Sequence, residues 1–294
     1  MISLSDAQAV QALLRRHGFH FSKAMGQNFI VDDTVCPRMA QQCGADSKTG
    51  VLEIGPGIGV LTRELSAVAQ KVVAVELDTR LLPVLKETLA DCRNVTVYNG
   101  DILKIDVHAL LKKEFSGMDV VVCANLPYYI TSPIIMKLLE EHLPIRALTV
   151  MVQKEAAERI CAEPGSRACG AVSAAVRYYA VPEILFGVGR DSFLPPPKVD
   201  SAVIRLNIPQ QPPFAVRDEK LFFKTVQAAF AQRRKTVVNS VSATLGIPKA
   251  ELAAQMEAAG LSPQARAEQL KMEELVVLAD LIGQIGKEES HAQV

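Results

Sequence analysis

The sequence lacks any apolar run approaching the roughly 20 residues that a membrane-spanning helix needs. Its first ten residues contain Asp6 and lack the basic start and apolar stretch of a secretion signal. The six cysteines form no Cys-x-x-Cys pair, the spacing that zinc and redox sites favour. Together these absences predict a cytoplasmic protein with reduced cysteines and no bound metal.

An excess of basic charge is also missing, since 32 Lys and Arg residues balance 32 Asp and Glu residues. Net charge therefore gives no indication of a polyanionic partner. A local basic surface can still bind nucleic acid, because affinity depends on how many phosphates are neutralised at the contact. Arg233, Arg234 and Lys235 form such a basic run, for which a solvated helix face is the alternative explanation.

Short β-branched runs alternate with helical patterns between residues 51 and 206, which is typical of parallel strands joined by crossover helices. The predicted parallel strands are Val51–Ile54, Val72–Val75, Val95–Tyr98, Val120–Cys123 and Leu148–Val152. Two further runs, Glu183–Val188 and Ala202–Leu206, are expected to form a hairpin that closes the sheet. The pattern predicts an α/β, doubly wound fold with a mixed, mostly parallel sheet.

A proline-rich polar stretch at residues 207–213 has the composition of a linker. Beyond it, apolar residues recur at helical spacing over Leu221–Val241, Lys249–Ala258 and Met272–Ile282. In the first of these stretches the basic run would project outward. The chain is therefore predicted to comprise a main domain at 1–208 and a small all-helical domain at 209–294.

The first predicted strand breaks into three alternate glycines, in the segment Glu53-Ile-Gly-Pro-Gly-Ile-Gly59. Glycine allows positive φ and a close backbone approach, so Gly55 and Gly57 are expected to cradle a ligand. The spacing differs from the Gly-x-Gly-x-x-Gly that places a helix N-terminus beside a pyrophosphate, and Glu53 would repel a phosphate. The amino group of S-adenosylmethionine suits that carboxylate better. A nicotinamide-dependent dehydrogenase remains the alternative.

Acidic residues follow the next two predicted strands. Glu76 lies about twenty residues past the glycines, where an acidic side chain commonly accepts hydrogen bonds from ribose hydroxyls, and Leu77 adjoins it. Asp101 is expected to accept from the adenine amino group of the same cofactor, with Ile102 packed on the ring. Each carboxylate alone could be a helix cap. Taken together with the glycine loop, the two carboxylates indicate the same cofactor, S-adenosylmethionine.

The fourth predicted strand leads into Asn125-Leu126-Pro127-Tyr128. An adenine amino group is a poor nucleophile, because its lone pair is delocalised into the ring. The Asn125 side-chain oxygen and a carbonyl around Leu126 or Pro127 could accept its two N–H groups and free the lone pair for a methyl group. Tyr128 offers a face on which the base can stack. This chemistry requires no metal and no covalent nucleophile.

With these motifs in place, the sequence resembles the ribosomal RNA adenine dimethyltransferase family over nearly its whole length, most closely its bacterial small-subunit branch. The segments that carry the resemblance are Gly26-Gln-Asn-Phe29, the glycine loop, Glu76, Asp101, Asn125–Tyr128, Phe193-Leu-Pro-Pro-Pro-Lys-Val-Asp-Ser201 and Ala229-Phe-Ala-Gln-Arg-Arg-Lys-Thr236. The resemblance implies a Rossmann-like class I methyltransferase domain that dimethylates two adjacent adenines near the 3′ end of small-subunit rRNA.

The same resemblance implies roles for residues outside the strand ends. Asn28 and Ile30 would contact S-adenosylmethionine from an N-terminal arm, and Phe193 would lie on the face of the target base opposite Tyr128. The basic run at 233–235 would contact RNA phosphates in an assembling ribosomal subunit, with the enzyme acting as a monomer. Two alternatives stay open: a large-subunit rRNA methyltransferase, and a ribosome-assembly factor whose methylation is secondary.

Overall fold

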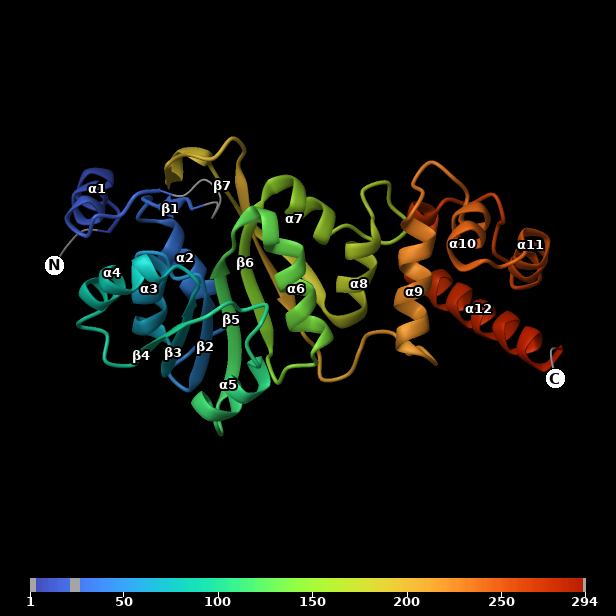
Figure 1. The fold of residues 1–294 in the computed structure, drawn as a ribbon, viewed down its shortest axis with the longest axis horizontal. Coiled ribbons are helices and arrows are strands. Elements are labelled where there is room, and N and C mark those ends of the chain that lie inside the picture. Colours follow the sequence, from blue (N-terminus) through green and yellow to red (C-terminus); the bar gives the residue numbers. More distant parts are fainter. Residues whose placement is uncertain (1–3, 22–26, 293–294) are drawn as a thin grey trace. The chain divides into compact units, whose positions relative to one another are not determined.

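The structure is a computed structural model that describes residues 4–21 and 27–292, with side chains as far as Ile285. The chain divides into two compact units (Figure 1), one formed by Met1–Ala157 with Pro182–Ile208 and the other by Glu158–Val181 with Pro209–Val294. The assignment of residues 1–208 to methyl transfer and 209–294 to RNA contact stays a prediction. Within the described residues, no helix is both long enough and apolar enough to cross a membrane.

A mixed sheet forms the centre of the first unit. Its strands, in spatial order, are β4 (Val95–Asn99), β3 (Lys71–Glu76), β2 (Thr49–Ile54), β5 (Asp119–Asn125), β6 (Ala147–Gln153), β9 (Ser201–Asn207) and β7 (Val181–Val188). The pairs from β4 to β6 are parallel, and β9 runs antiparallel to β6. The predicted fold class, its strands and its mixed edge are therefore confirmed.

The strand register brings four strand ends to one edge of the sheet. Ile54 of β2 lies opposite Val75 of β3 and Ala124 of β5, and Glu76 of β3 lies opposite Asn99 of β4. Ligands of open α/β sheets bind at the carboxyl ends of the strands, near the point where the strand order reverses. Here the order reverses at β2, which has β3 on one side and β5 on the other.

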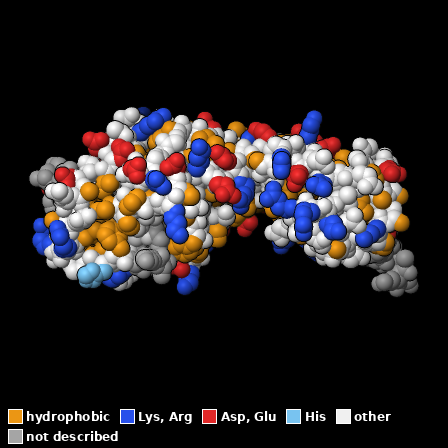
Figure 2. Space-filling view, turned by 90° about the horizontal axis from the view of Figure 1, so that it is seen from above, with side chains coloured by type: hydrophobic (Ala, Val, Ile, Leu, Met, Phe, Trp, Pro, Cys, Tyr) orange, Lys and Arg blue, Asp and Glu red, His pale blue; other side chains and the backbone are white. Residues whose placement is uncertain are grey.

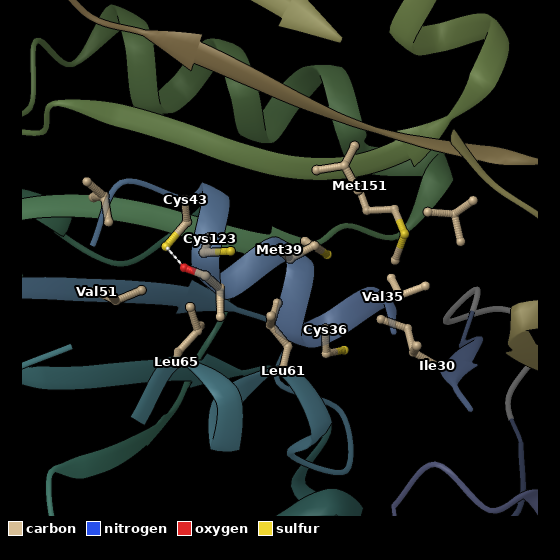
Figure 3. Close-up of a cluster of buried hydrophobic side chains, with 14 of the residues drawn as sticks. Ile30, Val35, Cys36, Met39, Cys43, Val51, Leu61, Leu65, Cys123 and Met151 are labelled. Carbon is tan, nitrogen blue, oxygen red and sulfur yellow. Dashed lines mark hydrogen bonds between the residues drawn. The ribbon is translucent and has the colours of Figure 1, made fainter. Parts of the chain in front are cut away.

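Helices α2 (Val35–Gln42) and α3 (Val60–Val68) contribute to a buried core on one face of the sheet. Figure 3 shows Cys43, which directly follows α2, beside Cys123 of β5, and the same core contains Met39 of α2 and Val51 of β2. The cysteines are free thiols in the described structure, and the Cys43 thiol donates to the carbonyl of Ala40 at 3.1 Å. This core anchors β2 beneath the glycine loop.

The remaining helices of the first unit connect the strands or precede them. They are α1 (Ala7–Arg16), α4 (Leu82–Thr88), α5 (Val107–Glu114), α6 (Thr131–Glu140) and the first part of α7 (Lys154–Ile160). A second sheet, made of two short strands, pairs β1 (Phe29–Ile30) with β8 (Phe193–Leu194), so that Ile30 lies opposite Phe193. The sequence predicted only a turn at 193–198, and this pairing joins segments more than 160 residues apart.

The second unit contains α8 (Ala171–Tyr179), α9 (Glu219–Phe230), α10 (Val237–Leu245), α11 (Lys249–Ala258) and α12 (Met272–Ala292). The prediction of one helix over Leu221–Val241 is wrong, because the chain turns between Phe230 and Val237. Thr236 caps α10 through its hydroxyl, and the Ser240 hydroxyl donates to the Ala228 carbonyl at 2.6 Å. The seven-residue spacing from Phe230 to Val237 fits a continuous helix, so the apolar pattern concealed this break.

Candidate active site

A cavity opens where the ends of β2, β3 and β5 meet, and it gathers every residue predicted to bind the cofactor together with the whole tetrapeptide. These residues are Asn28, Ile30, Glu53, Gly55, Gly57, Glu76, Leu77, Asp101, Ile102, Asn125, Leu126, Pro127 and Tyr128. They come from five separate segments of the first unit. Such a convergence of polar groups in an otherwise apolar concavity is the usual form of a small-molecule site.

The glycine loop forms the floor of the cavity. Gly55 has a φ of 67°, and a Cβ at this position would meet no atom within 4 Å, so the space above it belongs to the cavity. Gly57 has a φ of 62°, and a Cβ there would lie 3.2 Å from the ring of Phe29. Both positions therefore require glycine, one to leave room for a ligand and the other to let β1 pack closely.

Glu53 is a buried carboxylate in the cavity wall, with 1% of its surface exposed. Burial raises the pKa of Glu53 to about 8; the nearby Thr62 hydroxyl opposes the shift, and the Glu76 carboxylate adds to it. Oε2 of Glu53 and Oγ1 of Thr62 have no hydrogen-bond partner in the described structure. A buried, unsatisfied acceptor facing a cavity is suited to a ligand that carries a positive charge and N–H donors.

Glu76 is held by two backbone amides at the end of β3. Its Oε2 accepts from Gly57 N at 3.2 Å and its Oε1 from Asp78 N at 2.7 Å. Asn99 of the adjacent strand donates to the Glu76 carbonyl at 2.8 Å. Burial raises the pKa of Glu76, and the backbone hydrogen bonds oppose that shift. The carboxylate is thus fixed in place with lone pairs left to accept ribose hydroxyls.

Asp101 and Ile102 lie on the far wall, beyond β4. Oδ1 of Asp101 accepts from Leu103 N at 3.0 Å, and Ile102 is 5% exposed. The Asp101 carboxylate therefore also stabilises the turn in which it lies, in the manner of a cap. An apolar side chain beside a partly exposed acceptor fits the edge of an adenine ring. Together with Glu53 and Glu76, these residues fit S-adenosylmethionine from its methionine end to its adenine.

The Asn125 side chain points toward the N-terminal arm. Its Nδ2 donates to the carbonyl of Asn28 at 3.4 Å. A carbonyl can only accept, so the amide nitrogen must face Asn28 and the amide oxygen must face elsewhere. The arm therefore orients the catalytic amide predicted from the sequence and leaves its oxygen available as an acceptor.

The two carbonyls that follow Asn125 differ in their partners. The Pro127 carbonyl accepts from Ile130 N and from Thr131 Oγ1, both at 3.2 Å, and so joins the turn that begins α6. The backbone amide of Leu126 donates to the Met151 carbonyl of β6 at 3.2 Å. Since the Pro127 carbonyl already serves two donors, the Leu126 carbonyl is the better candidate for a second acceptor.

Tyr128 is anchored through its hydroxyl, which lies 2.6 Å from Oγ of the fully buried Ser201 in β9. Burial raises the pKa of Tyr128, so the phenol is neutral at physiological pH. Ser201 ends the Phe193–Ser201 segment noted in the sequence, and this contact gives that residue a function that spacing alone did not indicate. The ring of Tyr128 lines the cavity beside Asn125.

Phe193 is the predicted site residue that the structure does not bring to the cavity. Its side chain is 3% exposed and belongs to the buried core that also contains Ile30 and Val203. Arg233, Arg234 and Lys235 are exposed in the turn after α9, in the second unit. Figure 2 shows Lys and Arg side chains gathered on one face of that unit. Gly26, part of the arm motif, lies outside the described residues.

Sequence reasoning missed several lining residues, among them Gln27 and Tyr129. Tyr129 directly follows the tetrapeptide and is 56% exposed. Gln27 lies in the Gly26–Phe29 segment that carries the family resemblance, and Tyr129 adjoins the predicted tetrapeptide; these were the available signals. No group of three or more His, Cys, Asp or Glu residues suited to a metal ion occurs in the part of the chain that the structure describes.

The chain is similar to known proteins in sequence and, separately, in structure. A sequence model of the family described as ribosomal RNA adenine dimethylase matches residues 18–284. The chain is 47% identical over 274 residues to the ribosomal RNA small subunit methyltransferase A of Geobacillus thermodenitrificans, covering 92% of this chain and 94% of the relative. It is 46% identical over 286 residues to the protein of the same name from Bacillus mycoides, covering 96% and 98%.

Solved structures give consistent matches. The 23S rRNA methyltransferase ErmE aligns with a TM-score of 0.67 and 27% identity, covering 87% of this chain and 100% of that one. A dimethyladenosine transferase from Plasmodium falciparum aligns with a TM-score of 0.70 and 26% identity, covering 86% and 96%. Both alignments extend beyond the sheet domain predicted at 1–208, so the similarity includes part of the helical region.

Proposed function

The chain belongs to the ribosomal RNA adenine dimethylase family, and on this premise we propose that it dimethylates N6 of two adjacent adenines in a 3′-terminal hairpin of small-subunit rRNA. It does so as an S-adenosylmethionine-dependent enzyme of ribosome biogenesis. The observation that carries the proposal is the cavity itself, where Asn125 and Tyr128 face the same space as Glu53, Gly55 and Glu76. Family membership removes the support for a nicotinamide-dependent dehydrogenase.

In this proposal different walls of the cavity bind different parts of the cofactor. Glu53 lies toward the methionine amino group, Glu76 accepts the ribose hydroxyls, and Asp101 with Ile102 receives the adenine. Asn28, Ile30, Gly55, Gly57 and Leu77 complete the cofactor surface. When bound, S-adenosyl-L-methionine supplies an electrophilic methyl group on a positively charged sulfur and leaves as S-adenosyl-L-homocysteine.

Catalysis would come from positioning and from fixed acceptors. The Asn125 amide oxygen and the Leu126 carbonyl accept the two N–H groups of adenine N6, which draws the nitrogen lone pair out of conjugation. Pro127 shapes the turn, and Tyr128 stacks on the base that has left its helix. A sandwich with Phe193 requires that side chain to leave its buried position, so the structure supports Tyr128 more strongly than Phe193.

The choice of the small subunit over the large one rests on similarity. Relatives named small subunit methyltransferase A are 46–47% identical to this chain, whereas the 23S rRNA methyltransferase ErmE is 27% identical. We place the enzyme in the cytoplasm as a monomer that acts on an assembling subunit. Arg233, Arg234 and Lys235 are exposed and suited to phosphate contacts there.

The test is incubation of the purified protein with methyl-labelled S-adenosylmethionine and unmethylated ribosomal subunits, followed by nucleoside analysis. Dimethyladenosine in small-subunit rRNA at two adjacent positions is the expected result. Label confined to large-subunit rRNA would transfer the proposal to the macrolide-resistance type of enzyme. Absence of labelled dimethyladenosine in both subunits would refute the proposal.

A second candidate function is binding to the assembling subunit, with methylation secondary. The observation that favours it is the exposed basic run at 233–235, which lies outside the cavity lining. An Asn125→Ala variant that still restores subunit maturation in a deletion strain would support this role. Failure of that variant to restore maturation would assign the role to methylation.

A further inference from the structure

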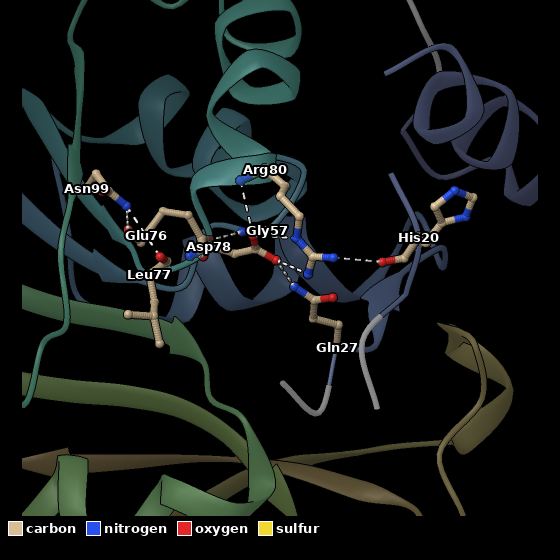
Figure 4. A network of polar contacts seen from close by, with 8 residues as sticks. All are labelled: His20, Gln27, Gly57, Glu76, Leu77, Asp78, Arg80 and Asn99. Atoms are coloured by element: carbon tan, nitrogen blue, oxygen red, sulfur yellow. Dashed lines mark hydrogen bonds and ion pairs between the residues drawn. The ribbon is translucent and has the colours of Figure 1, made fainter. Parts of the chain in front are cut away.

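Asp78 is a buried carboxylate just past the end of β3 that does not line the cavity. Its oxygens accept from the Arg80 side chain, from Nε at 2.9 Å and from Nη2 at 2.6 Å, and from the Gln27 side chain at 2.8 Å (Figure 4). The Arg80 hydrogen bonds hold the pKa of Asp78 below its ordinary value, so it is ionised at neutral pH. A buried charge with this many donors makes strong, directional contacts.

The Asp78–Arg80 pair is tied to the N-terminal segment at two points. Gln27 belongs to the arm that lines the cavity, and Arg80 Nη1 donates to the His20 carbonyl at 3.3 Å. The Arg80 guanidinium also lies 5.0 Å from the ring centroid of Phe19, which packs against Phe29 of β1. The Asp78–Arg80 ion pair therefore contacts the N-terminal segment at His20, before the arm, and at Gln27, where the described part of the arm begins.

Asp78 also adjoins the two functional ends of the cavity. Its backbone amide donates to Oε1 of Glu76 at 2.7 Å. It also accepts from Gln27, the residue next to Asn28, and the Asn28 carbonyl accepts from the Asn125 amide at 3.4 Å. The ribose acceptor and the catalytic amide thus share one support.

We propose that Asp78 is a positioning residue that, through Gln27, holds the arm over the cavity so that the Asn28 carbonyl fixes the orientation of the Asn125 amide. The inference rests on the proposed function and adds to it a residue that touches neither cofactor nor substrate. Without the Asp78–Gln27 hydrogen bond, the arm contributes less to cofactor binding. The Asn125 amide also loses the hydrogen bond to Asn28 that sets which way its oxygen and nitrogen point.

The test compares Asp78→Asn, Gln27→Ala and their double variant with a matched control, Asp106→Asn. Asp106 is the N-cap of α5, where it accepts from Ala109 N at 2.9 Å, and it lies outside the cavity lining. Three quantities are measured: the Kd of S-adenosylhomocysteine by calorimetry, amide hydrogen exchange of residues 27–31 without ligand, and the single-turnover methylation rate at saturating cofactor.

Each single variant is expected to raise the Kd about tenfold, the loss typical of one hydrogen bond to a buried charge. The double variant should bind no more weakly than Asp78→Asn alone, because that change already weakens the contact that Gln27→Ala removes. Exchange of the arm amides should accelerate, and turnover should fall even at saturating cofactor. The exchanged pair Gln27→Glu with Asp78→Asn restores a donor opposite an acceptor and should recover part of the affinity. The control should match the wild type in all three.

An unchanged Kd and unchanged arm exchange in Asp78→Asn would overturn the inference, as would fully additive effects of the two single changes. These outcomes are read against a wild type that binds S-adenosylhomocysteine and methylates small subunits. A wild type that does neither would instead refute the proposed function. The two failures are therefore distinguishable.

Discussion

The two sides of the cavity are built differently. On the cofactor side, Glu76 is fixed by backbone amides of Gly57 and Asp78, and Asp101 by the amide of Leu103 two residues away. On the side proposed for catalysis, Asn125 is oriented by Asn28 and Tyr128 by Ser201, partners 97 and 73 residues distant. The cofactor side is therefore largely a product of strand ends and their turns, whereas the catalytic side depends on long-range assembly.

This difference predicts that changes on the two sides separate binding from turnover. A residue held by its own turn should affect mainly the ligand it touches. A residue oriented by a partner that is distant in the sequence should lose its orientation when that partner is changed. Variants at Asn125, Phe193, Glu53 and Ser201 test this contrast.

The largest effect is expected for Asn125→Ala, which removes an acceptor aimed at the reacting amino group. Loss of one such preorganised group typically lowers kcat by about a hundred- to a thousandfold. The Kd of S-adenosylhomocysteine should rise only a few-fold, because the cofactor is held mainly by the other wall. Single-turnover methylation and calorimetry measure the two quantities. Normal turnover in this variant would end the role assigned to Asn125.

The same contrast explains how much of the molecule could be predicted from its sequence. Strands β2 to β6 and the cavity-lining residues at their ends were predictable, because β-branched runs and glycine spacing are local signals. The residues that orient Asn125 and Tyr128 were not predictable; nothing near Tyr128 in the sequence, for example, indicates Ser201. The pairing of β1 with β8 was hidden for the same reason, and it changes the interpretation of Phe193.

Phe193→Ala should give the next largest effect, on folding. The side chain is 3% exposed and packs in the core with Ile30, so its removal should lower the free energy of unfolding by about 3 kcal/mol. Urea denaturation measures this value, and Tyr128→Ala, at a partly exposed position, should cost less. Phe193→Leu provides the control, since it keeps an apolar side chain without an aromatic face. Turnover lost in a stably folded Phe193→Leu variant would favour base stacking over packing.

A smaller effect is expected from the pH dependence of cofactor binding. The pKa of Glu53 is about 8, so the group is mostly protonated at pH 7 and mostly ionised at pH 9. A positively charged cofactor binds the ionised form better, so affinity should rise about tenfold between these values, in proportion to the ionised fraction. Calorimetry across this range measures it. The Glu53→Gln variant should show a flatter profile, and an equally steep one would assign the pH dependence to another group.

In the second unit, a helical periodicity of apolar residues that was identified correctly led to a wrong prediction of one continuous helix. Phe222, Val226, Phe230 and Val237 fit one helix, and the break before Val237 becomes visible only when Thr236 is recognised as an N-cap. Residues 233–235 consequently lie in a turn rather than on a helix face. Their exposure was predicted correctly, but the local structure that presents them was not.

The smallest effect is expected for the hydroxyl pair that orients Tyr128. Ser201→Ala and Tyr128→Phe remove the same 2.6 Å hydrogen bond from opposite ends, and each should slow methylation about fivefold, corresponding to about 1 kcal/mol. The double variant should be no slower than either single one, since the ring itself remains available for stacking. Single-turnover rates at saturating cofactor measure the effect, and the Kd of S-adenosylhomocysteine should not change. Additive losses would mean that the two hydroxyls act separately, and then the catalytic side would be less dependent on distant partners than the geometry indicates.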